Sequence, residues 1–263
     1  MDGGAMNPDA LLGRVRKLLA MAEAEGLPDA ARESYNAKAA ELIAQYGIDR
    51  ALIEDGSPTG PAAGDVVMGI DAPYARDKIS LLASVADPLG CRLVHRTAPS
   101  PAGSGGATLH SAHLFGMAVD IERVQMIYTS LLVQQAHGLA AARPPAWEDP
   151  RAFRRSWMAG FAVAVRDRLA QAEEAARRRA EESRAADPAA AGPAARRSVA
   201  VVLAGREGLV EAHLARVYPR LRTTRTRQLS GSGGRDGYQA GQRADLGEGR
   251  RVPSQRRARR QIS

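Results

Sequence analysis

The sequence has few aromatic residues and no long apolar run. Aromatic side chains make up 4% of the 263 residues, so the core has to be built mainly from alanine, leucine and valine. No run of about eighteen apolar residues occurs, which excludes a typical membrane-spanning helix. The N-terminal stretch MDGGAMNPDA has neither a basic start nor an apolar segment, so no signal peptide is predicted.

Cysteine and the common catalytic motifs are equally scarce. The one cysteine, Cys91, excludes an internal disulfide, and a reducing cytoplasm is the expected location. No HExxH, paired CxxC, Walker loop or dinucleotide-binding GxGxxG occurs. The nearest approach to a metal-ligand set is Cys91, His95, His110 and His113. On strands, His110 and His113 would face opposite ways and Cys91 and His95 would lie about 13 Å apart, so neither a metal site nor a cofactor is predicted.

Lysine is scarce too, and arginine supplies almost all of the positive charge. The net charge of +8 is uneven: residues 1–55 carry −4, residues 56–143 carry 0, residues 144–195 carry +1 and residues 196–263 carry +11. Basicity is therefore a C-terminal property. Two interpretations stay open, because richness in Arg, Ala, Gly and Pro also follows from G+C-rich coding DNA: a solubilising tail, or a surface for phosphates.

The most informative stretch is residues 11–54, which predict a helical hairpin. Apolar residues recur at helical spacing from Leu11 to Ala22, and Gly26-Leu27-Pro28 then interrupts the chain. Asp29 is expected to cap a second helix, and Gly47 is expected to end it in a left-handed C-cap. Two amphipathic helices of this kind bury their apolar stripes against each other or against a third surface.

Two strings in the hairpin carry a family resemblance, RKLLAMA from Arg16 and KAAELIAQYGI from Lys38. They resemble the KLLALA-like and KAxxLMxKYGI-like helices of the bacterial and phage family known as domain of unknown function 2786. This chain has Ile43 where that pattern has methionine, and Gln45 where it has a basic residue. LFGMAVDIE, SLLVQQA, FRRSWMAGFA and GYQAGQRADL resemble its companion, domain of unknown function 7168. Neither resemblance implies an activity, a partner or a catalytic residue.

An α+β domain is predicted over residues 65–218, after a linker at 55–64 rich in glycine and proline. Strands are expected at 65–70, 91–96 and 107–115, the last two forming an antiparallel hairpin with a long loop. Helices are expected from Pro73 to Gly90 and from Asp120, as N-cap, to about Ala142. A further helix begins at Asp149-Pro150. It buries a core stripe and then continues as a solvated extension; the stripe is Phe153, Trp157, Phe161, Val165 and Leu169.

The C-terminal third is predicted to be less ordered. A break is expected at 187–195, a strand at 198–204 and a short helix at 207–218. Residues 219–263 are predicted to form a disordered basic tail that contains a small helical island, GYQAGQRADL, and residues 1–10 are also expected to be disordered. The predicted class is helix-rich α+β: an N-terminal α-helical hairpin, a small antiparallel or mixed sheet packed with long helices, and the basic tail.

The arginines of the tail are the candidate site, because the planar guanidinium suits phosphate. The candidates are Arg220, Arg222, Arg225, Arg227, Arg256, Arg257, Arg259 and Arg260. The leading hypothesis is a non-enzymatic module of phage or mobile-element type that contacts DNA or RNA through this tail. An adaptor whose hairpin docks a protein partner is the alternative. An enzyme with an unrecognised site beside the hairpin would show convergent carboxylates or a histidine of shifted pKa.

Overall fold

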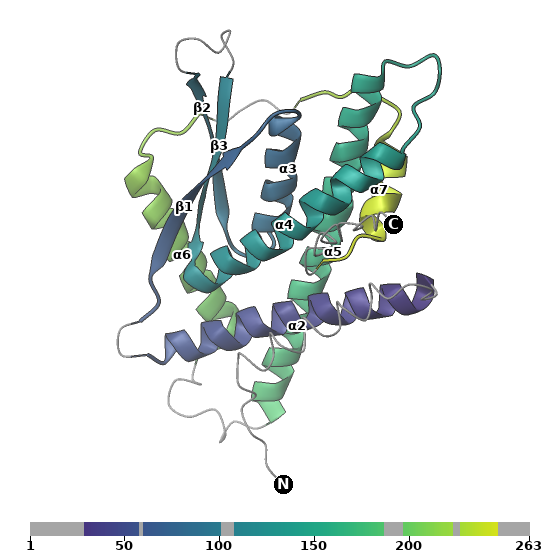
Figure 1. The fold of residues 1–263 in the computed structure, drawn as a ribbon. Coiled ribbons are helices and arrows are strands. Elements are labelled where there is room, and N and C mark those ends of the chain that lie inside the picture. The colour runs from purple at the N-terminus through teal and green to yellow at the C-terminus, as the bar shows by residue number, and fades with distance from the viewer. Residues whose placement is uncertain (1–28, 58–59, 101–107, 187–196, 223–226, 247–263) are drawn as a thin grey trace, which may run out of the picture.

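The computed structural model describes residues 29–57, 60–100, 108–186, 197–222 and 227–246, and the first predicted helix, residues 11–22, lies outside them. Within the described residues the helix-rich α+β class is confirmed (Figure 1). The elements are α2 (Asp29–Asp55), β1 (Ala63–Ile70), α3 (Ala75–Ala86), β2 (Arg92–Pro99), β3 (Thr108–Met117), α4 (Ala118–Ala141), α5 (Pro150–Ala186), α6 (Val199–Val217) and α7 (Gly234–Gln242). None of these helices combines the length and apolar character needed to cross a bilayer.

The three strands form an antiparallel sheet with β3 in the centre, in the order β1-β3-β2. The predicted strand positions and the predicted β2–β3 hairpin are confirmed, with Leu93 opposite Leu114 and Val94 opposite His113. Because β1 and β2 both run antiparallel to β3, they are parallel to each other and are connected through α3. Side chains alternate between the two faces of the sheet, so Leu114 and His113 point to opposite sides.

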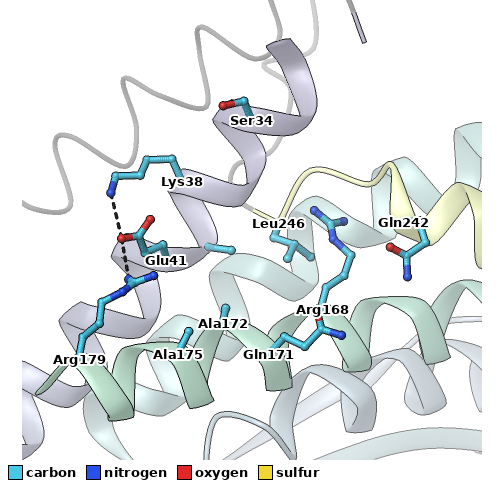
Figure 2. A pocket seen from close by; sticks show the side chains of 11 residues that line it. Ser34, Lys38, Glu41, Arg168, Gln171, Ala172, Ala175, Arg179, Gln242 and Leu246 are labelled. Carbon is cyan, nitrogen blue, oxygen red and sulfur yellow. Dashed lines mark hydrogen bonds and ion pairs between the residues drawn. The ribbon is translucent and has the colours of Figure 1, made fainter. Parts of the chain in front are cut away.

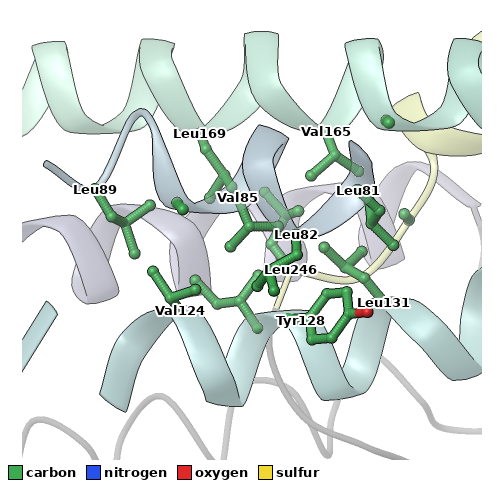
Figure 3. Close-up of a cluster of buried hydrophobic side chains, with 14 of the residues drawn as sticks. Leu81, Leu82, Val85, Leu89, Val124, Tyr128, Leu131, Val165, Leu169 and Leu246 are labelled. Atoms are coloured by element: carbon green, nitrogen blue, oxygen red, sulfur yellow. The ribbon is translucent and has the colours of Figure 1, made fainter. Parts of the chain in front are cut away.

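Helices cover both faces of this sheet. Helices α3, α4 and α5 share the main core with Leu114, whereas α6 packs Val210 against Phe115 on the other face. Figure 3 shows the centre of the main core, where Val85 of α3 lies between Leu169 of α5 and Val124 of α4. The predicted core stripe of α5 is confirmed, because all five of its side chains are at most 2% exposed.

Helix α2 is one continuous helix of 27 residues, and Gly47 lies inside it, so the predicted C-cap at Gly47 is wrong. A Cβ atom added at Gly47 would lie 2.1 Å from Nη1 of Arg123 on α4. The glycine therefore makes room for a side chain of another helix and does not end its own. Ala44 and Ile48 of α2 pack against Ala176 of α5 and Val199 of α6, which fixes the second hairpin helix to the rest of the fold.

The predicted strand at 198–204 is wrong, since these residues form the start of α6. The run contains three valines, which favours a strand, but the buried side chains of α6 recur at helical intervals: Val199, Val202, Arg206 and Val210. Ser198 caps the helix, its side chain accepting a hydrogen bond from the backbone N–H of Val201. Burial of one helical face decides the structure over the local β preference.

Asp149 and Asp120 are both predicted to lie at the start of a helix, and the prediction is correct for Asp149 only. Asp149 accepts hydrogen bonds from the backbone N–H groups of Arg151 and Ala152, so it caps α5 as predicted. Asp120 is not the N-cap of α4, because the helix begins at Ala118 and the carboxylate binds two arginines instead. The later part of α5 is not merely a solvated extension either, since Ala176 is 3% exposed.

Part of the predicted basic tail belongs to the core. The predicted helical island is confirmed in α7, which packs along α5 (Figure 1). Glycine permits the close approach: a Cβ atom on Gly160 of α5 would lie 1.9 Å from the carbonyl oxygen of Gly234. Ala244 and Leu246 after α7 are 4% and 1% exposed. The prediction of disorder is therefore wrong for residues 227–236, which precede the predicted island, and residues 247–263 lie outside the described part.

Candidate functional site

A chain of hydrogen bonds centred on Asp65 joins the sheet to the end of α6. Asp65 Oδ2 lies 2.8 Å from Nε2 of His113 on β3, and its Oδ1 lies 2.5 Å from Nε2 of His213 on α6. His113 Nδ1 lies 2.8 Å from the hydroxyl of Tyr218, and Arg216 donates to Nδ1 of His213. These five residues are called the Asp65 cluster below.

The protonation of the Asp65 cluster follows from its partners. A carboxylate can only accept, so both histidines donate from Nε2, and Nδ1 of His213 accepts from Arg216. The hydrogen bond from His113 is the largest cause that lowers the pKa of Asp65 below its ordinary value of 3.8, followed by the hydrogen bond from His213. Asp65 is thus a stable anion that orients both histidine rings.

The Asp65 cluster fixes the backbone that displays the candidate arginines. Tyr218 also packs edge-on against Phe115, with ring centroids 5.9 Å apart. Arg220 and Arg222 follow two and four residues later and are both exposed. Arg216, one turn earlier on α6, is exposed as well. Three arginines therefore stand on a short segment whose start is held by the sheet.

The other candidate arginines have different positions. Arg227 forms an ion pair with Asp77 of α3, a buried carboxylate, so its guanidinium already has an anionic partner within the protein. Arg225, Arg256, Arg257, Arg259 and Arg260 lie outside the described residues. Because Arg227 neutralises a carboxylate of α3, it is a weaker candidate for a phosphate contact than Arg220 and Arg222.

The histidines and the cysteine do not converge on one point. His95 Nε2 and His110 Nδ1 are 2.9 Å apart on neighbouring strands, whereas His113 belongs to the Asp65 cluster on the opposite face. Cys91 is buried, and burial raises the pKa of its thiol to about 12, so the thiolate needed for nucleophilic chemistry is scarce at neutral pH. Among the described residues no group of three or more His, Cys, Asp or Glu side chains is placed to hold a metal ion.

Carboxylates do converge where α2 meets the rest of the fold, which is the arrangement that the enzyme hypothesis requires. Arg123 of α4 binds Asp120 and Glu173, and Arg206 of α6 binds Asp120 and Glu54 of α2, forming the interface network. Burial raises the pKa of Glu173, against the attraction of Arg123. The adjoining cavity measures only about 50 Å³, and each carboxylate is already paired. This network ties four helices together and leaves no room for a substrate.

A larger groove of about 570 Å³ lies between α2, α5 and the residues around the end of α7, as Figure 2 shows. Glu41 of α2 binds Lys38 at 2.9 Å and Arg179 of α5 at 2.6 Å. Arg168 of α5 donates to the backbone carbonyls of Gly241 and Ala244. Glu41, Arg168 and Arg179 therefore hold α2 and α7 on α5, whereas Lys38 pairs within α2.

Comparison with known proteins gives a match over most of the segment that is predicted to form the hairpin. Residues 10–50 match the model of the family described as Protein of unknown function (DUF2786). The resemblance read from the two strings is thereby confirmed for this segment. No curated protein and no solved structure matches the chain.

The DUF2786 segment meets the rest of the protein at both of the sites just described. Lys38 belongs to the groove, and Gly47 receives Arg123 of the interface network. The sequence pattern alone drew attention to Gly47 as a helix end. Its role as a contact depends on Arg123, which lies 76 positions away and carries no local signal.

Sequence reasoning missed most of the Asp65 cluster. His113 was considered only as a metal ligand, while Asp65 was read as the start of a strand. His213 and Tyr218 were read only as part of a short helix. The period of two on β3 was the usable signal, since it separates His113 from the histidine pair on the other face. Its partners are 48 and 105 residues away in the chain, beyond the reach of any local pattern.

Proposed function

We propose that this protein is a non-enzymatic module that associates with DNA or RNA through the arginines that follow α6. The observation that carries the proposal is that Arg220 and Arg222 are exposed directly after Tyr218, whose hydroxyl and ring are held by the sheet. A backbone that is already fixed loses little conformational entropy when its side chains bind. A guanidinium presents a planar fork of donors that matches phosphate oxygens.

The charge distribution supports the same surface. Residues 196–263 carry +11, and this segment supplies Arg216, Arg220 and Arg222 from its described part. Arg225, Arg256, Arg257, Arg259 and Arg260 remain part of the proposal on sequence grounds. Contacts with phosphates carry no base information, so binding is expected to be independent of sequence and strongly dependent on salt.

The proposal includes a relationship of the later segments to domain of unknown function 7168, and an origin in phage or mobile elements. Support for the first part is that the four resembling strings occupy elements of one core. LFGMAVDIE spans the junction of β3 and α4, and SLLVQQA lies on α4. FRRSWMAGFA and GYQAGQRADL bring α5 and α7 together where Gly160 faces the backbone of Tyr238 and Gly237 faces the backbone of Trp157.

The test is fluorescence anisotropy of labelled duplex DNA and of RNA against the full chain across a salt series. We expect the double variant Arg220→Ala/Arg222→Ala to bind more weakly and to reduce the slope of log affinity against log salt by about 2, because each duplex phosphate contact contributes about 0.9. The matched control is Arg151→Ala/Arg178→Ala, which removes the same charge from exposed positions of α5.

The outcomes separate cleanly. A loss confined to the Arg220/Arg222 variant supports the proposed surface. An equal loss in the α5 control would mean that net charge alone governs binding, and it would overturn the assignment to the segment after α6. No binding by the unaltered chain near physiological salt would overturn the function itself.

A further inference from the structure

A second, separate pocket opens where the start of α3 meets α4 and α5. Its volume is about 340 Å³, within the range of small-molecule sites. Most of its wall is apolar, formed by Pro73, Tyr74, Leu132, Leu139, Met158 and the alanines at 136 and 140. This pocket is on the opposite side of the sheet from the Asp65 cluster and shares no residue with it. It is called the α3–α5 pocket below.

One polar group in the α3–α5 pocket is buried without a partner. Gln135 of α4 is 2% exposed, and its Nε2 has no hydrogen-bond partner among the described residues. A buried amide N–H normally has an acceptor, because burial removes its hydrogen bonds to water and an unpaired N–H gains no hydrogen bond in the protein to offset that loss. The same side chain lines the pocket; its Nε2 is closed to solvent as placed, so an acceptor carried by a ligand satisfies it once the amide rotates toward the pocket.

Two charged side chains line the α3–α5 pocket, Lys78 and Arg154, and both are basic. Lys78 donates one hydrogen bond to the backbone carbonyl of Asp71 at 2.8 Å, which leaves two of its ammonium protons for other acceptors. Arg154 of α5 is exposed at the lining. Within the part of the chain that the structure describes, no acidic side chain lines this pocket, so its electrostatic preference is for an anion.

The backbone fixes one wall of the pocket in an uncommon conformation. Tyr74 precedes α3 with φ 63° and ψ 29°, a left-handed geometry that is unusual for an aromatic residue. Its carbonyl oxygen accepts from the backbone N–H groups of Asp77 and Lys78, which holds the turn in place. The ring of Tyr74 is therefore set by the backbone that also positions Lys78.

We propose that the α3–α5 pocket binds a small organic monocarboxylate with an apolar body, such as a medium-chain fatty acid or an aryl carboxylate. The apolar body lies against Leu132, Leu139 and Met158, and the carboxylate accepts from Gln135 and from the basic pair Lys78 and Arg154. The few donors and the largely apolar wall favour a singly charged group over a phosphate, which requires more donors. This site does not depend on the proposed nucleic-acid surface.

The test is isothermal titration of the full chain with octanoate and with benzoate, alongside 1-octanol and octylamine at constant ionic strength. We expect saturable binding of at least one carboxylate, weaker binding of the neutral alcohol and none of the cation. Ala136→Phe places a ring at an exposed position of the lining and should weaken carboxylate binding at least about tenfold. Val133→Phe is the matched control, because Val133 is exposed on the same helix and does not line the pocket.

A second variant separates binding from folding. Gln135→Leu removes the unpaired amide, so it should raise the melting temperature of the free protein and yet weaken carboxylate binding. Absence of saturable carboxylate binding up to millimolar concentration by the folded chain would overturn the proposal. So would equal affinity for 1-octanol, or binding that Ala136→Phe leaves unchanged.

Discussion

At the scale of single residues, some polar side chains have hydrogen-bond partners, and a few others are buried without one. Asp65 accepts from two histidines, whereas the hydroxyl of Tyr128 and the amide nitrogen of Gln135 have no partner among the described residues. A paired group stabilises the fold modestly, and an unpaired buried group costs more than a typical pair gains. The two kinds of residue should therefore respond in opposite ways to the loss of a polar atom.

Tyr128→Phe is expected to stabilise the protein. The Tyr128 ring is 2% exposed in the core between α3 and α4, and burial raises the pKa of its hydroxyl. Phenylalanine keeps the ring and removes the unpaired hydroxyl, so the free energy of unfolding should rise by about 1 kcal/mol in urea titrations. Tyr218→Phe, which removes the partner of His113, should lower it by a similar amount. A loss of stability in Tyr128→Phe would show that the hydroxyl has a partner.

Because of Asp65, the free energy of unfolding should depend on pH in the acidic range. Its pKa in the folded state is lowered from 3.8 by the hydrogen bonds from His113 and His213, so its contribution is present above about pH 3.8 and disappears as the pH falls through the lower folded value. The variant Asp65→Asn cannot titrate there. The difference in free energy of unfolding between the two proteins should shrink as the pH falls below about 3.8. A difference that grows below this pH would contradict the cluster as described.

At the scale of elements, the helices are joined by close contacts at glycines and by the interface network. Gly47 of α2 receives Arg123, which is 3% exposed and held by Asp120 and Glu173. An arginine that is buried and doubly paired cannot move aside cheaply, because its charge would lose its partners. The packing of α2 therefore depends on the absence of one side chain.

Gly47→Ala is expected to destabilise the protein by about 2 kcal/mol or more, although alanine favours a helix over glycine by about 1 kcal/mol. The control is Gly205→Ala on α6, where an added Cβ meets nothing within 4 Å. That variant should stabilise by about 0.5 to 1 kcal/mol. Urea unfolding of both variants at one pH makes the comparison. A gain in stability at both positions would show that Arg123 adapts freely.

The elements also show what the sequence can and cannot predict. The strands and the core stripe of α5 were predictable, because period-two and helical patterns report directly on burial. The start of α6 was not, since Val199 and Val201 fit the spacing of a strand while Val199 and Val202 fit that of a helix, and only the partner surface decides between them. Helix α7 has few apolar residues, and its packing through Gly234 depends on Gly160 of another helix. The Asp65 cluster was out of reach for the same reason, as its members come from three distant segments.

At the scale of the whole molecule, the chain closes on itself near both described ends. Helix α2 crosses α5, and the segment after α7 inserts Leu246 into the core shared by α3 and α4, as Figure 3 shows. The basic segment after α6 therefore connects two packed helices, α6 and α7. Arg220 and Arg222 are exposed on this segment, and Arg227 forms an ion pair with Asp77. Removing everything after α6 to test the arginines would also remove part of the core.

Two truncations should separate these roles. A chain that ends at Leu246 keeps α7 and every core side chain that the structure describes, and its melting temperature should stay within a few degrees of that of the full chain. A chain that ends at Arg227 loses Leu246, whose removal alone is expected to cost about 2 to 5 kcal/mol, together with the contact of α7 along α5. Circular dichroism melts and binding of a hydrophobic dye would report exposure of the core. If the shorter chain has the same melting temperature as the full one, α7 does not contribute to the stability of the core. The segment after α6 would then be better described as disordered, as its composition predicts.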